Sequence, residues 1–342
     1  MNVLKALDAE ANYSKSQLQF ILGAWVLSTL VDRKEAISTT DGDVDEDDYE
    51  KRSIYSLFYS LYRSMGDVPS GAGNRYELTF NTWGYEWPAS WGQCQNNPAD
   101  PQRFGQNAYT GLYHFDEVKA YVAERAGRVH VVEMGCGTGA GANHVCSRVL
   151  PNCTYEAVDM QAAAIRTCER KFVPNLAGRL VATHSDATKL AARDATADFV
   201  AVNETHVTEL AGQVTDEDER FFRTAYRMLK PGGFLVWGNA IPDSTWEPCF
   251  QFLESIGMER LHVEDVTAEA IVARDLDKVR VDAYVDHCID AFHGFKIPML
   301  GKKRKVEAAL AMKNFYRNPG TRLYDRMVDG TDSYKVVLFR KK

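Results

Sequence analysis

The 342-residue chain lacks an excess of positive charge, which argues against a nucleic-acid partner. It carries 47 Asp and Glu against 40 Lys and Arg, a formal net charge of −7. Binding to nucleic acid depends mainly on Lys and Arg clustered at the phosphates. We interpret the short basic run "KKRK" (302–305) as a solvent-exposed turn, with a phosphate or membrane contact as the alternative.

Long apolar runs are also absent. The most apolar stretch, "FILGAWVLSTLV" (20–31), is shorter than the roughly 20 residues that a membrane-spanning helix needs. The first residues, "MNVLKALDAEANYS", show no basic leader followed by an apolar stretch. We therefore expect a cytoplasmic protein with no signal peptide and no membrane span.

Cysteine is present, but its spacing fits neither a disulfide framework nor a metal site. The seven cysteines form no C-x-x-C pair, and an odd, scattered set indicates free thiols in a reducing compartment. The His/Cys pairs near Cys146 and Cys288 lack partners at zinc-like spacing. The run "DGDVDEDDYE" (41–50) lacks the glycine and glutamate of a calcium loop, so we interpret it as a charged linker and expect no metal.

From Val129 onward, short apolar runs alternate with helical patterns. The runs "VHVVEMG", "TYEAVDM", "RLVATHSD", "DFVAVN" and "GGFLVWGNAI" are typical of buried strands. Their alternation with helices predicts βαβ units, so the expected fold class is α/β with a mostly parallel sheet and flanking helices. Two further strands, "ERLHVEDVT" and "SYKVVLFRKK", complete a seven-stranded, Rossmann-like sheet.

Helical segments flank this predicted core. Apolar residues between 18 and 30 recur at helical spacing, and "SIYSLFYSLYRSM" (53–65) predicts a second helix. The first helix would suit packing on its own domain or a homodimer contact. We divide the chain into a helical and loop cap region (1–120), a core (121–265), a helical lid insertion (266–331) and a last strand (332–342).

A glycine-rich loop follows the first predicted strand. The strand "VHVVEMG" runs into "GCGTGAG" and then a helix, so the backbone can approach a ligand closely at the free N–H groups of the helix start. Gly135, Gly137 and Ala140 also satisfy the dinucleotide pattern G-x-G-x-x-G/A, a weak signal on its own.

Three acidic residues and a turn extend this motif. Glu133 precedes the first glycine by two residues, Asp159 ends the second predicted strand, and Asp186 ends the third. A carboxylate at the end of the second strand can accept hydrogen bonds from ribose hydroxyls. The turn "LKPGG" (229–233) announces the fifth strand.

Together these features resemble the class I S-adenosylmethionine-dependent methyltransferases, in particular the small-molecule C-methyltransferases that act on sterols, tocopherols and phthiotriolones. The resemblance covers roughly 129–241 most strongly. It implies S-adenosylmethionine as the cofactor and a set of cofactor-binding residues: Glu133 in the loop motif, Gly135 and Gly137 under the amino-acid part, Asp159 at the ribose, Met160 on the adenine, Asp186 and Ala187 at the adenine edge, and Asn203 closing the loop after strand four.

The segment "NTWGYEWP" (81–88) resembles the Gly-Tyr segment that lies over the cofactor in these enzymes. Aromatic faces stabilise a cation such as a sulfonium. We therefore predict that Tyr85 contacts the cofactor. The alternative is an apolar patch that pins a long loop to the core.

Polar residues crowd the stretch "VNETHVTEL" (202–210), directly after the fourth strand. In this group the end of that strand faces the methyl group, so Glu204 and His206 are candidate catalytic residues, as a base or as an orienting group. Side chains two apart on an extended segment share a face. Either residue could instead cap a helix. Their spacing departs from the Glu-x-x-His or Glu-x-x-x-His usual in related C-methyltransferases, which leaves the methylated atom open.

We predict methyl transfer to a small-molecule acceptor. Aromatic residues near the end of the chain, among them Phe292, Phe295, Phe315, Tyr316 and Tyr324, suggest an apolar acceptor pocket or an ordinary core. Two other functions compete: a nicotinamide-dependent oxidoreductase, and a non-methylating binding protein or cyclase on the same fold. An oxidoreductase has no role for the turn "LKPGG", and a non-methylating protein has no need of an acid beside a histidine.

Overall fold

The computed structural model of the chain describes residues 79–80, 82–94, 96–190, 194–205, 212–293, 309–310 and 313–342. Several predictions lie outside these residues: the helices at 18–30 and 53–65, the linker at 41–50, the basic run at 302–305, His206, and the possible dimer contact of the first helix.

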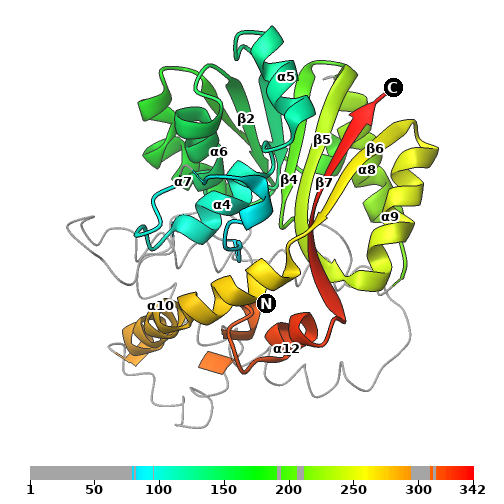
Figure 1. Cartoon of the computed structure of the whole chain (residues 1–342). Coiled ribbons are helices and arrows are strands. Elements are labelled where there is room, and N and C mark those ends of the chain that lie inside the picture. The colour runs from blue at the N-terminus through cyan, green and yellow to red at the C-terminus, as the bar shows by residue number, and fades with distance from the viewer. Residues whose placement is uncertain are drawn as a thin grey trace, which may run out of the picture.

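A seven-stranded sheet forms the centre of the molecule, in the order β3-β2-β1-β4-β5-β7-β6 (Figure 1). The strands are β1 (His130–Met134), β2 (Thr154–Asp159), β3 (Leu180–His184), β4 (Ala197–Asn203), β5 (Leu229–Pro242), β6 (Met258–Asp265) and β7 (Asp332–Lys341). The pairs from β3 to β5 are parallel, and β7 runs antiparallel to both β5 and β6. The predicted fold class, an α/β protein with a mostly parallel Rossmann-like sheet, is confirmed.

The central strands are buried on both faces, as the continuous apolar runs predict. All seven residues of β4 are buried. Neighbouring side chains enter opposite layers: Val131 and Phe199 pack in one apolar core, and Val132 and Val200 in the other. A parallel sheet covered on both sides by helices has this pattern, because crossover connections place helices on its faces.

Helices cover each face of the sheet. The first core includes residues from α4 (Arg103–Gly111), α5 (Asp116–Glu124), α6 (Ala140–His144) and α7 (Ala162–Lys171). The second includes α8 (Asp216–Met228) and α9 (Asp243–Ser255). Short 3-10 helices occupy Ala89–Trp91, Val173–Leu176 and Ala187–Lys189, and a π-helical turn, Val145–Val149, continues α6.

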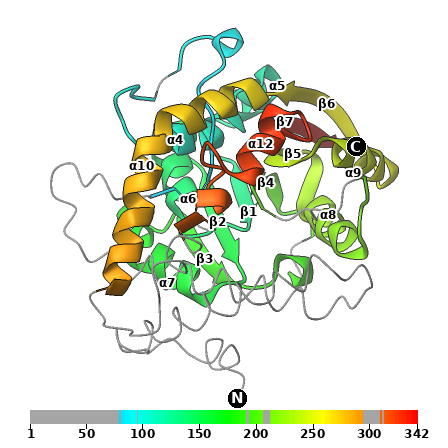
Figure 2. The ribbon, with the colours of Figure 1, turned by 90° about the horizontal axis from the view of Figure 1, so that it is seen from below.

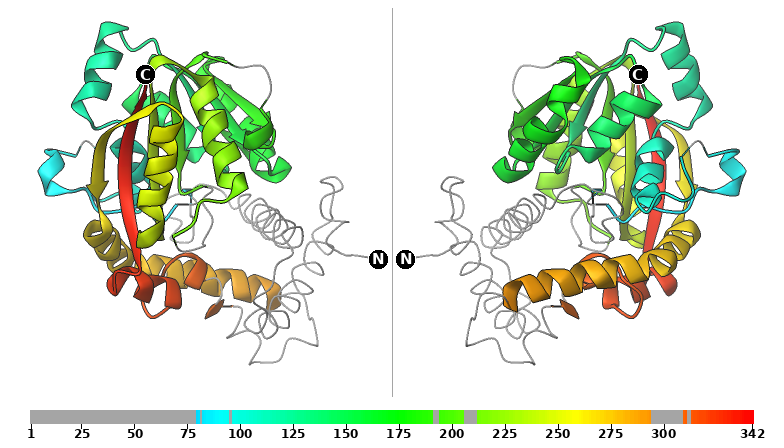
Figure 3. Two further views of the ribbon diagram at one scale, coloured as in Figure 1. Left: turned by 90° about the vertical axis from the view of Figure 1, so that its right-hand side faces the viewer. Right: turned by 90° about the vertical axis from the view of Figure 1, so that its left-hand side faces the viewer.

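Two helices lie across the carboxyl ends of the parallel strands. They are α10 (Thr267–His293) and α12 (Arg322–Val328), and both come between β6 and β7 in the sequence. In Figure 1 both helices lie at the lower edge of the sheet, where β5 and β6 end and β7 begins. The side views agree (Figure 3). From below, α10 runs beside the strand ends with α12 next to it (Figure 2).

Candidate active site

The predicted site residues gather at the carboxyl ends of β1, β2 and β4. The chain leaves β1 for β2 on one side, while β4 lies on the other side of β1. This is the point where strand order reverses, and open α/β sheets bind ligands in the crevice beyond such a reversal. The glycine loop follows β1, Asp159 ends β2, and Asn203 ends β4.

The loop after β1 requires glycine for two separate reasons at Gly135. Its φ of 86° lies in the left-handed region, which side chains disfavour. A Cβ at this position would lie 2.1 Å from Cγ2 of Thr205. The N–H groups of Gly135 and Cys136 both donate to the carbonyl of Val158, at 2.8 and 2.9 Å, which fixes the loop against β2.

Asp159 joins the loop to the end of β2. Its carboxylate accepts hydrogen bonds from the N–H groups of Gly137 (2.8 Å) and Gln161 (2.7 Å). The side chain is only 8% exposed, and burial raises the pKa of Asp159 to about 6. A carboxylate has about four acceptor positions, so two N–H donors leave capacity for ribose hydroxyls.

Glu133 lies one layer deeper than the loop and is completely buried. Its Oε2 accepts a hydrogen bond from the Tyr155 hydroxyl at 3.0 Å, whereas Oε1 has no partner among the described residues. Burial raises the pKa of Glu133 to about 7. A buried acceptor without a donor is uncommon, so Oε1 is available to a donor that enters the site.

The residues predicted at the adenine lie at the ends of β2 and β3. Met160 is 37% exposed, unusual for a large apolar side chain beside a buried strand. Asp186 accepts hydrogen bonds from Thr188, caps the short helix that begins at Ala187, and pairs with Lys189 at 2.9 Å. Although burial alone would raise the pKa of Asp186, the bonds from Lys189 and Thr188 hold it below its usual value.

Asn203, the last residue of β4, carries an unsatisfied amide. It is 5% exposed, and neither its Oδ1 nor its Nδ2 has a hydrogen-bond partner in the described part of the chain. Leaving a buried polar group unpaired costs roughly 1–3 kcal/mol, so such groups often mark a ligand position. Together with the free acceptor capacity of Asp159 and Glu133, this amide fits a polar cofactor at the loop.

Glu204 departs from the expected geometry. The strand ends at Asn203, and Glu204 has a φ of 48°, so the chain is not extended there. The predicted shared face of Glu204 and His206 requires an extended chain, and this requirement is not met at Glu204. His206 itself lies outside the described residues. The N–H of Glu204 donates to the carbonyl of Gly238 at 2.7 Å, which holds the turn against β5.

The carboxylate of Glu204 is occupied by groups from distant parts of the sequence. It accepts hydrogen bonds from the Thr82 hydroxyl, the N–H groups of Trp83 (2.7 Å) and Gly84 (3.0 Å), and the Tyr334 hydroxyl (2.8 Å). One carboxylate thus fastens the segment 82–86, which we call the cover segment, to the ends of β4 and β7.

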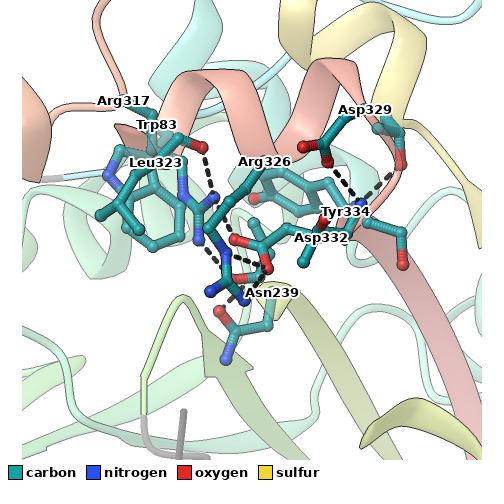
Figure 4. A network of polar contacts seen from close by, with 12 residues as sticks. Trp83, Asn239, Arg317, Leu323, Arg326, Asp329, Asp332 and Tyr334 are labelled. Carbon is teal, nitrogen blue, oxygen red and sulfur yellow. Dashed lines mark hydrogen bonds and ion pairs between the residues drawn. The ribbon is translucent and has the colours of Figure 1, made fainter. Parts of the chain in front are cut away.

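The cover segment is also tied to the chain before α12. The indole N–H of Trp83 donates to the carbonyl of Phe315 at 2.8 Å, and the Arg317 guanidinium stacks on the Trp83 ring at 4.5 Å. Arg317 and Arg326 both pair with the buried Asp332 of β7 (Figure 4). These contacts join the cover segment, the stretch before α12 and the last strand.

Tyr85 lies in the cover segment but is completely buried. Its ring packs edge-on against Tyr334 and Trp91, at 5.3 and 5.8 Å between centroids. Burial, with a further contribution from the nearby Glu204 carboxylate, raises the pKa of Tyr85 well above its usual value. The side chain has no exposed surface, and its contact with the cofactor stays a prediction.

Sequence reasoning missed the partners that hold this arrangement together. Trp83 and Tyr334 both reach Glu204, and Tyr109 packs against the start of α6, where a Cβ on Gly141 would meet its ring at 1.9 Å. The aromatic segment around Trp83 is a visible signal in the sequence, but the prediction falls on its neighbour Tyr85. Tyr334 and Tyr109 carried no local signal, because their roles depend on contacts far apart in the sequence.

The described residues form no cluster of metal ligands. Within the described ranges, no three His, Cys, Asp or Glu residues lie close enough together to hold a metal ion. The six cysteines that the structure describes are free thiols. Of the helices described, none has the length and apolar character needed to cross a membrane.

Comparison with known proteins supports the predicted class. A family model described as a methyltransferase domain matches residues 131–233. The phthiotriol/phenolphthiotriol dimycocerosates methyltransferase of Mycobacterium tuberculosis is 25% identical over 290 residues, which cover 85% of this chain and 93% of that protein. The fatty-acid O-methyltransferase of Mycolicibacterium smegmatis is 23% identical over 265 residues, or 78% of this chain and 84% of that protein.

Solved structures share the fold. The (4+2)-cyclase SpnF aligns with a TM-score of 0.56 and 19% identity, over 85% of this chain and 95% of that one. Geranyl diphosphate methyltransferase, solved with sinefungin, aligns with a TM-score of 0.51 and 13% identity, over 84% of this chain and 98% of that one. At such identities these alignments show the fold alone.

The methyltransferase-domain match spans β1 to the start of β5, with the glycine loop and the acid at the end of β2, and supports a class I S-adenosylmethionine-dependent methyltransferase. The chain is thus a methyltransferase of this class, with S-adenosylmethionine as its cofactor, as its sequence predicted.

Proposed function

We propose that this enzyme transfers a methyl group to a small apolar acceptor, a lipid or lipid-like molecule, bound between the strand ends and α10. The observation that carries the proposal is the aromatic cover fastened to Glu204, since it would enclose an apolar acceptor beside the cofactor. Two relatives, named as methyltransferases of phthiotriol dimycocerosates and of fatty acids, support a lipid acceptor.

The cofactor supplies an electrophilic methyl group on a sulfonium, and the chain's residues hold both reactants. In this proposal the amino-acid part of the cofactor binds at Gly135, Gly137 and Glu133. Asp159 accepts hydrogen bonds from the ribose hydroxyls. The unpaired amide of Asn203 binds beside the loop. Met160, Asp186 and Ala187 face the adenine, where the exposed Met160 offers an apolar surface.

Glu204 acts in this proposal as the orienting group. Its oxygens already accept four hydrogen bonds, which leaves little capacity to take a proton from an acceptor. By fixing the cover segment, Glu204 would shape the acceptor site and keep water out. An acceptor that carries a proton would need His206 or solvent as the base, and His206 stays a prediction.

The test is transfer of label from methyl-labelled S-adenosylmethionine to a panel of apolar acceptors. The panel contains long-chain acids, alcohols, amines and thiols, and mass spectrometry locates the methylated atom. We expect label to enter the organic phase with at least one of these acceptors. If the protein binds the cofactor but labels none of them, the proposed acceptor class is wrong.

The alternative predicted from the sequence is a non-methylating role, such as that of a cyclase, on the same fold. The same labelling experiment separates the two. With an unsaturated acceptor added to the panel, a cyclase would consume that acceptor without any loss of label from S-adenosylmethionine, whereas a methyltransferase releases S-adenosylhomocysteine in equal amounts with product.

A further inference from the structure

The inner face of α10 carries a buried cluster of charges. Arg274 and Asp277 are 3% and 4% exposed, and they lie on the same side of the helix as the buried Ala270 and Val281. Arg280 completes the cluster. Two guanidinium groups therefore share a single carboxylate in this cluster.

Asp277 forms its short hydrogen bonds with Arg280 and only one long contact with Arg274. The Arg280 Nε and Nη2 groups donate to the two Asp277 oxygens at 2.6 and 2.7 Å, a bidentate pair. Arg274 makes one long contact, from Nη2 to Asp277 Oδ2 at 3.4 Å, and its Nε has no partner among the described residues. Arg274 is thus the unmatched cation of the cluster.

A buried guanidinium normally has several partners, because its five N–H donors lose their water on burial. Burial lowers the pKa of Arg274, and the nearby carboxylates of Asp277 and Glu204 only partly oppose this. Glu204 cannot complete the pairing, since its oxygens accept hydrogen bonds from the cover segment and Tyr334. The described residues therefore supply no anion for Arg274 beyond the shared Asp277, and the anionic group of a ligand would complete its pairing.

The position of Arg274 points to the proposed acceptor site. Glu204 and Tyr334, at the ends of β4 and β7, both act electrostatically on Arg274. The first turn of α10 is held to the cover segment, where the Glu86 N–H donates to the Glu269 carbonyl at 3.0 Å. Ten residues farther along α10, roughly 15 Å at a rise of about 1.5 Å per residue, Tyr284 packs edge-on against Tyr316 at 5.8 Å between ring centroids. A ligand whose anionic group binds Arg274 could therefore lay an apolar body of that length toward these rings.

From this unmatched guanidinium, its burial and the aromatic rings farther along α10, we infer that Arg274 binds the anionic group of an apolar acceptor. The ligand chemistry is a single carboxylate or phosphate monoester on an apolar body, because a planar guanidinium pairs well with both groups. The inference rests on the proposed function for the location of the acceptor.

Titration calorimetry with three ten-carbon probes, in the presence of S-adenosylhomocysteine, tests the inference. The probes are decanoate, decyl phosphate and decanol. The proteins are wild type, Arg274→Met and, as a control, Arg340→Met near the carboxyl end of β7. We expect wild type and the control to bind at least one anionic probe about tenfold or more tightly than decanol. Arg274→Met should bind the three probes alike.

The two anionic probes identify the group: tighter decanoate binding indicates a carboxylate, and tighter decyl phosphate binding indicates a phosphate monoester. Equal or tighter binding of decanol by wild type, or an anion preference that survives in Arg274→Met, would overturn the inference.

The thermal stability of Arg274→Met provides a second readout. An unpaired buried charge destabilises the ligand-free protein, so replacing it by an apolar side chain of similar length should raise the melting temperature by roughly 2–4 °C. A purely structural ion pair predicts a lower melting temperature instead.

Titration of S-adenosylmethionine separates the two proposals. Wild type and Arg274→Met should bind the cofactor equally. An anion preference that depends on Arg274, in a protein that transfers no methyl group, would leave the inference standing and refute the proposed function.

Discussion

At the scale of single residues, the cofactor site contains two acids, Asp159 and Glu133, whose burial disfavours the ionised form. Burial raises the pKa of Asp159 from 3.8 to about 6 and that of Glu133 from 4.5 to about 7. Because both folded-state pKa values are raised, each group stabilises the ligand-free fold in its protonated form. That contribution is present at low pH and is lost as the pH rises through about 6 and about 7.

The first prediction concerns cofactor affinity and pH. Asp159 accepts hydrogen bonds best when ionised, so affinity for S-adenosylmethionine should fall about tenfold per pH unit below pH 6, the value to which burial raises its pKa. Calorimetric titrations between pH 5 and pH 7 measure this. Glu133→Gln should keep the transition near pH 6, and affinity that does not change down to pH 5 would contradict the role of Asp159.

The second prediction separates an orienting role of Glu204 from a role as base. Glu204→Gln replaces one acceptor oxygen by an N–H₂ group that faces N–H donors of the cover segment. We expect the KM for S-adenosylmethionine to rise about tenfold or more, with the pH profile of kcat unchanged. Tyr334→Phe, which removes one of the four hydrogen bonds, should have a smaller effect in the same direction.

A catalytic base would behave differently. Its loss would lower kcat at least a hundredfold, leave cofactor affinity intact and remove one limb of the pH profile. That outcome in Glu204→Gln would refute the orienting role.

Single residues also show what the sequence could predict about the site. The glycines and Asp159 were identifiable because they belong to neighbouring strands at fixed, short spacing. The contacts of Glu204 were not, because its partners lie more than 100 residues away in both directions. The unmatched charge of Arg274 was equally hidden, since an arginine on a helix gives no sign of its burial or its partners.

At the scale of elements, the loop between β1 and α6 depends on a backbone that only glycine adopts without strain. Gly135 and Gly178 have similar φ values, 86° and 77°, but a Cβ on Gly178 meets nothing within 4 Å. The two positions therefore separate the conformational cost from the steric cost.

We expect Gly178→Ala to lower the free energy of unfolding by about 1–2 kcal/mol, the cost of the left-handed conformation alone. Gly135→Ala should lower it by roughly 3 kcal/mol or more, because its Cβ also displaces Thr205, and should weaken cofactor binding. Urea denaturation and calorimetry measure the two effects. Equal losses at both positions would contradict the tight packing of the loop against Thr205.

Most elements of the core could be predicted because each has its own sequence pattern. Buried parallel strands read as continuous apolar runs, and β4, with all seven residues buried, is the clearest case. The turn at Glu204 could not be predicted from periodicity. Glu204 has a positive φ and donates its N–H to Gly238 on β5, and a contact between strands distant in sequence leaves no local pattern.

At the scale of the whole molecule, segments from both ends of the described chain meet over the strand ends. Trp83 contacts Glu204 at the end of β4, Phe315 before α12, and Arg317, which in turn pairs with Asp332 of β7. Loss of one of these contacts should therefore lower the local stability of the other joined segments.

We expect hydrogen exchange to reveal this coupling. Binding of S-adenosylhomocysteine should slow exchange in peptides that cover 82–86 and 313–318 together, while the pairing of β6 with β7 stays unchanged. Trp83→Phe removes the indole N–H that reaches Phe315 and should restrict the protection to the first segment. Protection confined to the glycine loop in wild type would contradict a jointly held cover.

The central claim is that the crevice beyond β1, β2 and β4 binds S-adenosylmethionine through Asp159. Calorimetric titration of wild type and Asp159→Ala with S-adenosylmethionine and with NADH tests it most directly. The account predicts micromolar binding of S-adenosylmethionine to wild type, at least a tenfold loss in the variant, and no binding of NADH. Binding of NADH, or cofactor affinity unchanged in Asp159→Ala, would contradict it.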